Sequence, residues 1–211
     1  LDVDIVLECT GIFTDREKAS PHVRPDGAKK VIISAPAKSK DVPTIVLGVN
    51  EEKIDPNETV YSNASCTTNC LAPMVKIMLD NFGIKTGTMM TIHAYTADQN
   101  LQDAPHRDLR RARSAAVNIV PTSTGAASAL KLVIPEIGNK LSSASYRVPV
   151  ITGSIVDLNL ILEKSATVEQ INHAFQEASG NKMKGIVQYC VDPLVSSDIV
   201  RNPYSCIFDS L

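Results

Sequence analysis

Residues 62–73 read SNASCTTNCLAP, and this stretch decides how the rest of the chain is interpreted. A strand-like run precedes it, and apolar residues recur at helical spacing over 71–79. Ser65 and its polar neighbours are typical helix caps, so we predict a helix that begins at or just before Cys66. Pro73 lacks a backbone N–H and is expected to bend this helix unless it lies in the first turns.

The position of Cys66 at a helix N-terminus favours a reactive thiol. Unpaired backbone N–H groups and the positive end of the helix dipole stabilise a thiolate, and the same N–H groups can stabilise an oxyanion. The alternative is a small buried hydrophobic residue, and this stretch alone favours that alternative by about two to one. Cys70 lies one turn further on and is predicted to be buried and structural. The Cys-x3-Cys spacing is no convincing metal signature, so no metal site is predicted.

The composition indicates an ordinary globular protein. The 211 residues fit one large or two small domains, and a net charge of −2 gives no reason to expect a nucleic-acid or membrane partner. Five irregularly spaced cysteines favour reduced thiols in a cytoplasmic compartment. The chain opens on a strand-like run from Leu1 without Met and closes on 207–211 without a helix or tail, so we expect a fragment.

The first 65 residues are predicted to form part of a parallel α/β sheet, a Rossmann-like domain. Its expected strands are residues 3–7, 31–33 and 44–47, with helical composition over 15–19. Ligands of such sheets lie at the carboxyl ends of the strands, where Thr10, Gly11 and Ser34 follow two of these runs. Turn formation alone would also explain these three residues, and the sequence favours that alternative. No G-x-G-x-x-G motif occurs.

His93 is the candidate general base. It lies near the end of a predicted strand over 85–96, where a lone histidine is usually an accommodated side chain. It is also the only good base within reach of this part of the chain. The polar, irregular segment 97–118 follows, with arginines at 110, 111 and 113 that would form a solvated face, bind an anion or pin an interface.

The remaining sequence is predicted to complete an α+β domain over 66–211 with a largely antiparallel sheet. Its expected elements are a loop over 121–127 that enters a helix at 126–133, strands over 145–150 and 154–162, a helix from 167 to about 179, and strands over 185–191 and 205–208. Thr124 and Gly125 precede a helix, which suits either capping or an anion. Arg147 lies among apolar strand residues and needs a partner, for which a phosphate would serve.

Five motifs together resemble the glyceraldehyde-3-phosphate dehydrogenase family, phosphorylating type. They lie at residues 64–70, 93–99, 108–113, 121–127 and 147–154. The resemblance extends from Val3 to the end and corresponds to the central portion of the family's chain. It implies NAD-dependent oxidation of D-glyceraldehyde 3-phosphate to 1,3-bisphosphoglycerate. Cys66 would form a thiohemiacetal and then a thioester that inorganic phosphate attacks, while His93 would raise the thiolate fraction and accept the hydroxyl proton.

The resemblance also assigns binding roles. Residues Ser65, Thr67, Thr124 and Gly125 correspond to the site for attacking phosphate, and Thr96, Asp98 and Arg147 to the site for the substrate's own phosphate. Thr10, Gly11 and Ser34 correspond to cofactor contacts. The segment 95–118 resembles a loop that packs against a neighbouring subunit of a homotetramer, which makes its arginines ion-pair or interface residues rather than nucleic-acid binders.

Departures from the family leave alternatives open. The glycine-rich unit, the acidic residue that reads the ribose and the C-terminal strand and helix do not occur in this sequence. Pro105 weakly favours NAD over NADP. An erythrose-4-phosphate dehydrogenase shares the cysteine motif, although the Thr124–Gly125 loop favours the three-carbon substrate. The alternative of another class is a catalytically inert binding protein.

Overall fold

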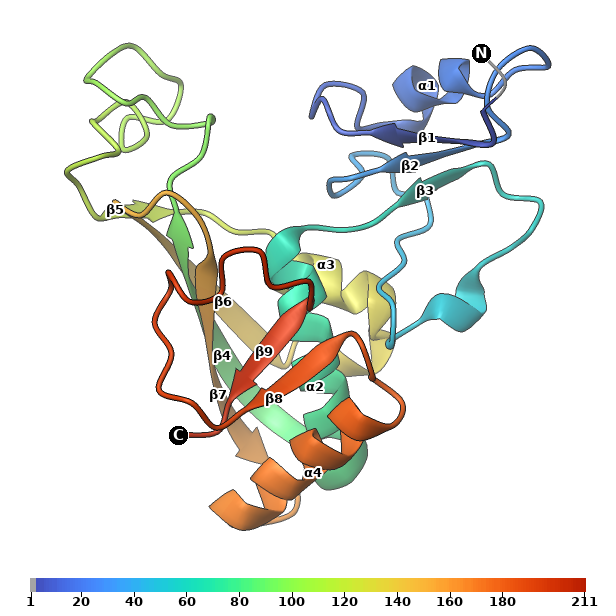
Figure 1. Cartoon of the computed structure of the whole chain (residues 1–211). Coiled ribbons are helices and arrows are strands. Elements are labelled where there is room, and N and C mark those ends of the chain that lie inside the picture. The colour runs from blue at the N-terminus through green and yellow to red at the C-terminus, as the bar shows by residue number, and fades with distance from the viewer. Residues whose placement is uncertain (1–2) are drawn as a thin grey trace.

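A computed structural model describes residues 3–211, so the beginning of the strand-like run at Leu1 lies outside the described residues. The N-terminal sheet is parallel, as the sequence predicts, and its strands lie in the order β1 (Ile5–Glu8), β2 (Lys30–Ile33) and β3 (Val60–Ser62). A short helix, α1 (Arg16–Ala19), and a 3-10 turn, η1 (Ser20–His22), connect β1 to β2. Figure 1 shows this sheet as a separate layer above the larger part of the molecule.

The predicted strand over 44–47 is wrong. Only Thr44 forms an isolated bridge, to Ser62, and a turn follows that leads into η2 (Glu51–Lys53). The cause is the buried side chain of Asn50, whose Oδ1 accepts the Val46 N–H at 2.8 Å and whose Nδ2 donates to the Thr44 carbonyl at 2.9 Å. These bonds satisfy the backbone groups that a strand partner would otherwise take.

The larger part is built on a mixed sheet of four strands in the order β5-β6-β4-β7. Its strands are β4 (Ile84–Ala94), β5 (Val120–Thr122), β6 (Leu141–Val148) and β7 (Ser154–Leu162). The β4–β7 and β5–β6 pairs are antiparallel, and the β4–β6 pair is parallel. A separate parallel pair joins β8 (Val187–Cys190) and β9 (Cys206–Asp209). The α/β and α+β fold class is confirmed.

One long helix, α2 (Cys66–Phe82), lies at the centre of this part (Figure 1). It begins at Cys66 as predicted and continues through Pro73. It packs against α3 (Ala126–Val133), α4 (Val168–Gly180), β9 and the four-stranded sheet, and η3 (Pro135–Ile137) follows α3. The α2 side chains of Leu71 and Val75 are fully buried in one apolar core with residues of these elements.

Local sequence signals explain several boundaries. The helix predicted from 167 to about 179 is α4, where Thr167 and Gln170 form a capping box at the start and Asn181 is the C-cap. β7 spans 154–162 as predicted, and its alternating burial places one face on the core. None of the helices described in residues 3–211 is long and apolar enough to cross a bilayer.

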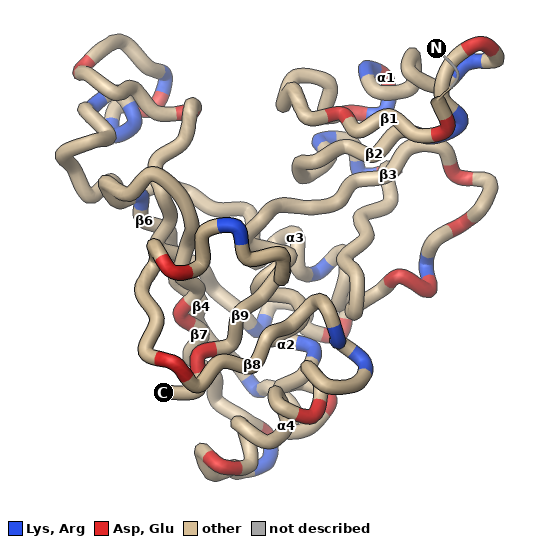
Figure 2. The backbone as a smooth tube through the Cα atoms, in the orientation of Figure 1, with Lys and Arg blue, Asp and Glu red and all other residues tan. Residues whose placement is uncertain are grey.

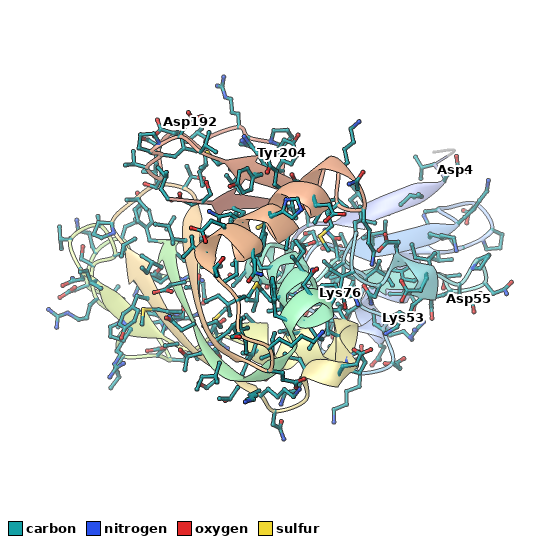
Figure 3. All side chains as sticks on the ribbon, turned by 90° about the horizontal axis from the view of Figure 1, so that it is seen from below. Asp4, Lys53, Asp55, Lys76, Asp192 and Tyr204 are labelled. Atoms are coloured by element: carbon teal, nitrogen blue, oxygen red, sulfur yellow. The ribbon has the colours of Figure 1, made fainter. Side chains whose placement is uncertain are left out.

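Charged residues of both signs are spread over the molecule rather than gathered by sign (Figure 2). The segment between β4 and β5 carries both basic and acidic residues (Figure 2). Seen from below, Asp192 and Tyr204 lie near the β8–β9 end of the molecule, whereas Asp4 and Asp55 lie with the N-terminal sheet (Figure 3). Tyr204 is one of the residues that line a cavity described below.

Candidate active site

The chain enters the site through a tight turn between β3 and α2. Ala64 adopts a left-handed backbone conformation with φ of 59°, which is uncommon for a residue with a side chain. Ser65 is the N-cap of α2, and its Oγ accepts the Thr68 N–H at 3.0 Å. The Asn69 Nδ2 donates to the carbonyls of Asn63 at 2.7 Å and Ser65 at 2.9 Å. These bonds hold the turn that presents Cys66 as the first residue of the helix.

Cys66 and His93 meet at this helix start. The Cys66 Sγ and the His93 Nε2 lie 3.4 Å apart, and the Cys66 residue is exposed. The interaction with His93 lowers the pKa of the Cys66 thiol below its ordinary value, in spite of partial burial. The Thr67 backbone N–H adds to this shift, as expected at a helix N-terminus. This arrangement can generate a thiolate at Cys66, because His93 lies close enough to exchange a proton with the sulfur.

Arg147 reaches the same histidine from the neighbouring strand. The parallel β4–β6 register pairs His93 with Arg147. The Arg147 Nη1 lies 2.5 Å from the His93 Nδ1 and donates to the Ala94 carbonyl at 2.9 Å. Burial and the nearby Arg111 guanidinium lower the pKa of Arg147. Its Nε is buried without a hydrogen-bond partner among the described residues.

The predicted residues Thr96 and Asp98 lie just beyond the end of β4. Asp98 forms an ion pair with Arg111, whose Nε and Nη2 lie 2.9 and 2.6 Å from the Thr122 Oγ1. The Thr96 N–H faces the Gln99 Oε1 at 3.3 Å. The sequence alone does not distinguish Arg111 from the arginines at 110 and 113. Only the fold distinguishes it: Arg111 is mostly buried and close enough to Arg147 to lower its pKa, whereas Arg113 pairs with Asp103 at the exposed surface.

The predicted residues for attacking phosphate lie at two helix starts. Ser65 and Thr67 are at the N-terminus of α2, and Thr124 and Gly125 precede α3, which packs against α2. The N-cap of α3 is Gly125, which has no capping side chain, and the Thr124 Oγ1 just before it accepts the Ala126 N–H at 3.2 Å. A side chain built at Gly125 would meet no atom within 4 Å, so the space over this helix start is open.

The predicted cofactor residues lie at the carboxyl edge of the N-terminal sheet. Thr10 and Gly11 follow β1, and Ser34 follows β2 and donates its N–H to the Glu8 carbonyl at 3.0 Å. The buried Glu8 carboxylate accepts the Thr10 N–H at 2.8 Å and also bonds the Thr10 hydroxyl. Gly11 has φ of 73° with open space around it, so backbone can approach a ligand closely there. The Thr10 donors are thus already bonded to Glu8, and the open backbone at Gly11 is the feature of this edge that leaves room for a ligand.

A cavity of about 400 Å³ lies beside the thiol, lined by Cys66, Cys70 and Cys190 among mainly apolar residues. All five cysteines are free. Cys70 is half-buried against the core, and its hydrogen bond with Cys206, together with burial, raises the pKa of Cys206 well above its ordinary value. No cluster of three His, Cys, Asp or Glu side chains suited to a metal ion occurs within residues 3–211.

The fold and the site define a class: an α/β protein with a thiol–imidazole pair at the start of its central helix. The C-terminal domain model of glyceraldehyde 3-phosphate dehydrogenase matches residues 65–211. The chain therefore belongs to the glyceraldehyde-3-phosphate dehydrogenase family, as the resemblance of its motifs predicts.

Curated relatives agree with this family. The chain is 59% identical over 210 residues to glyceraldehyde-3-phosphate dehydrogenases of Mycobacterium avium and of Mycobacterium tuberculosis strain H37Rv, and these alignments cover 100% of this chain and 61% of each relative. It is 55% identical over 211 residues to glyceraldehyde-3-phosphate dehydrogenase 1 of Streptomyces avermitilis, which covers 100% of this chain and 63% of the relative. The chain thus spans about three fifths of the length of these relatives.

Proposed function

We propose that this chain carries the catalytic centre of an NAD-dependent, phosphorylating glyceraldehyde-3-phosphate dehydrogenase that converts D-glyceraldehyde 3-phosphate to 1,3-bisphosphoglycerate. The observation that carries the proposal is the 3.4 Å separation of the Cys66 Sγ and the His93 Nε2 at a helix N-terminus. Family membership supports a glycolytic dehydrogenase, and the geometry supports the thiol as its nucleophile.

The thiolate of Cys66 attacks the aldehyde carbon and forms a thiohemiacetal. The first N–H groups of α2 stabilise the oxyanion that develops, because the start of a helix leaves such groups without intrahelical carbonyl partners and only that of Thr68 is bonded to Ser65. His93 takes the hydroxyl proton when the thiohemiacetal is oxidised to a thioester. NAD supplies the hydride acceptor for this oxidation. Thr10, Gly11 and Ser34 would hold it at the sheet edge that β3 connects to Cys66 through residues 63–65.

Two anion sites complete the proposal. Arg147, with Thr96 and Asp98 nearby, binds the phosphate of the substrate, and Arg111 belongs to this site through its ion pair with Asp98. Ser65, Thr67, Thr124 and Gly125 hold the inorganic phosphate that attacks the thioester, at the starts of two packed helices. Two separate sites are needed because both phosphates must be held around one sulfur.

Subunit contacts are part of the proposal. The segment between β4 and β5 exposes Leu109, Val117 and Ile119, each at least 70% accessible. Exposed apolar side chains gathered on one segment favour a protein partner. We therefore assign this segment to contacts within a homotetramer in the cytoplasm, where all five thiols would stay reduced.

The test measures phosphate-dependent formation of NADH by the purified full-length protein. Cys66→Ser should abolish turnover, because a hydroxyl is a far weaker nucleophile than a thiolate. Cys70→Ser is the matched control, since Cys70 lies one turn away in the same helix and should leave much of the activity. Comparable losses in both variants would overturn the role of Cys66.

The choice of substrate needs its own comparison. D-glyceraldehyde 3-phosphate and erythrose 4-phosphate are offered to the same enzyme at matched concentrations, and kcat/KM is measured for each. The three-carbon aldehyde should be preferred. Equal or greater turnover of the four-carbon aldehyde would favour an erythrose-4-phosphate dehydrogenase.

A further inference from the structure

Glu8 is the last residue of β1, and its side chain is buried at the carboxyl edge of the N-terminal sheet. Only 4% of the residue is exposed, so it offers almost no surface to a ligand that lies over this edge. A carboxylate is rarely buried to this extent unless its oxygens are paired. The contacts of the two oxygens therefore show what this buried charge holds in place.

One oxygen of Glu8 holds the turn that follows β1. Its Oε1 accepts the Thr10 N–H at 2.8 Å and also bonds the Thr10 hydroxyl. The Thr10 Oγ1 in turn accepts the Ile12 N–H at 3.1 Å. These three bonds fix the backbone on both sides of Gly11, whose φ of 73° is a conformation that glycine adopts without steric cost. The Thr10 side chain is thus used inside the turn.

The other oxygen of Glu8 faces His22 in η1. The His22 Nε2 lies 3.1 Å from Oε2, and the same ring packs edge to face against Phe13 with the ring centroids 6.3 Å apart. The 3-10 turn therefore supports both the carboxylate and the chain that leaves the Thr10 turn. The Glu8 carbonyl also accepts the Ser34 N–H at 3.0 Å. Glu8 thus contacts Thr10 and Ser34, two of the three residues predicted to contact the cofactor.

The bonds from Thr10 favour the ionised form of this carboxyl group. They lower the pKa of Glu8 in spite of its burial, and the contact with His22 adds to the shift. An ionised carboxylate only accepts hydrogen bonds, which suits the donors that surround it. Such charge-assisted bonds are about twice as strong as bonds between neutral groups. The turn is therefore held in one conformation before any ligand binds.

We propose that Glu8 is a positioning residue for the dinucleotide, and that its buried carboxylate holds the Thr10 turn so that the Gly11 backbone stays open to the ligand. A side chain built at Gly11 would meet no atom within 4 Å, which leaves room for close approach. The inference rests on the proposed function and deepens it. A turn that is already ordered loses little conformational freedom on binding, so Glu8 acts on the affinity for NAD and not on the chemical step.

The first test separates NAD affinity from turnover in the purified full-length protein. Glu8→Ala should raise KM for NAD by about tenfold or more, whereas kcat at saturating NAD should change by less than about twofold. Equilibrium binding of NADH, followed by its fluorescence, should weaken by the same factor as KM. The rate at which iodoacetamide alkylates Cys66 without NAD should stay at the wild-type value, because Glu8 and Cys66 lie in different layers.

Two variants distinguish positioning from a general weakening of the sheet. Glu8→Gln keeps an oxygen that can accept from Thr10, so it should recover most of the affinity lost in Glu8→Ala. Glu58→Ala removes another paired carboxylate, which lies before β3 at the opposite edge of the same sheet. It should lower stability and leave KM for NAD unchanged. An equal rise of KM in Glu58→Ala would show that sheet stability is the cause and would overturn the proposal.

Thr10→Val tests the turn without removing the buried charge. It deletes the hydroxyl that bonds Glu8 and Ile12, so KM for NAD should rise and the Ile12 amide should exchange faster, whereas Thr10→Ser should behave as the wild type. If the two residues act through one turn, the variant with both Glu8→Ala and Thr10→Val should bind NADH no more weakly than the weaker single variant. Effects that multiply would overturn the proposal.

The outcomes keep this inference separate from the proposed function. If the wild type forms NADH and Thr10→Val leaves KM for NAD unchanged, the inference is wrong while the proposed function stands, whether or not Glu8→Ala folds. If the wild type forms no NADH but binds it, the proposed function is wrong and the binding measurements still decide the role of Glu8. A wild type that neither forms nor binds NADH would overturn both.

Discussion

The catalytic role proposed for His93 depends on a change in the pKa of one thiol. Its Nε2 lies beside the Cys66 Sγ, and this interaction is the largest cause of the lowered thiol pKa. The thiolate is therefore expected to persist to a lower pH than in free cysteine, which titrates near ~8.5. Iodoacetamide alkylation measured against pH should accordingly reach half its maximal rate below that value.

His93→Asn tests this role. Without the imidazole the alkylation midpoint should move up toward the value for free cysteine, and kcat/KM should fall by roughly two to four orders of magnitude. His173 on α4 offers a control, because His173→Asn changes the same side chain away from the thiol. A midpoint that stays in place in His93→Asn would show that the helix start alone lowers the pKa.

For single residues, the sequence predicts local features such as a helix cap better than it predicts contacts between distant residues. The cap at Ser65 and the helix start at Cys66 follow from local residue types and are confirmed. The pairing of His93 with Arg147 joins strands that are far apart in the sequence, so it depends on the parallel register of β4 and β6. The ion pair of Arg111 with Asp98 depends on how the segment between β4 and β5 folds back on itself. Neither could be predicted from local pattern.

The element that presents the thiol is the turn between β3 and α2, and one amide group holds it. Ala64 has φ of 59°, a conformation that costs of order 1 kcal/mol or more for a residue other than glycine. The Asn69 Nδ2 bonds two carbonyls on either side of Ala64 and so offsets this strain. The asparagine and serine residues of this stretch predict that the helix start is capped. They do not predict that the Asn69 side chain bonds these two carbonyls.

Asn69→Ala should release this turn. We expect a loss of about 1–2 kcal/mol in unfolding free energy and a slower alkylation of Cys66, because the helix start no longer holds one orientation. Asn81→Ala is the matched control, since the Asn81 Nδ2 donates to the Ile77 carbonyl at 2.8 Å near the other end of the same helix. It should reduce stability without changing thiol reactivity. Equal alkylation rates in the two variants would contradict the role of Asn69.

The sequence predicts best those elements whose apolar residues recur at a regular spacing or whose ends carry a clear cap. β7 and the capping box of α4 are confirmed because alternation and caps act within a few residues. The run over 44–47 has the composition of a strand, yet the buried Asn50 side chain takes its backbone groups and folds it into a turn. A single buried amide outweighed four residues of β-propensity.

At the scale of the whole molecule, an ion-pair network joins distant segments of the N-terminal sheet. Arg16 in α1 bonds Asp41 and Glu58, and the pairing with Arg16 lowers the pKa of Glu58 from 4.5 to about 2. A carboxyl group whose pKa is lower in the folded than in the unfolded protein stabilises the fold at any pH above its unfolded-state pKa. This contribution is lost as the pH falls through the folded-state pKa. Stability of this sheet should therefore decrease between about pH 4.5 and pH 2.

Glu58→Gln tests the network. The opening free energy of the β1, β2 and β3 amides, obtained from hydrogen exchange after correction for the intrinsic pH dependence of exchange, should fall less steeply with acid in the variant, because one titrating group is gone. Glu51→Gln on η2 changes an exposed carboxyl group outside the network and should keep the wild-type dependence. A slope that persists unchanged in Glu58→Gln would mean that other carboxyl groups cause the acid sensitivity.

The short run from the end of β3 to the start of α2 limits how far the Cys66 thiol can lie from the N-terminal sheet. Ser62 closes the last strand of one layer, and Cys66 opens the central helix of the other. Four residues span at most about 14 Å even when fully extended, so the sulfur cannot drift away from the edge where a dinucleotide would lie. Any movement of one layer relative to the other would therefore move the sheet edge and the Cys66 thiol together. An insertion in this run would lengthen the connection and move the thiol away from that sheet edge before it disturbed the packing of either layer.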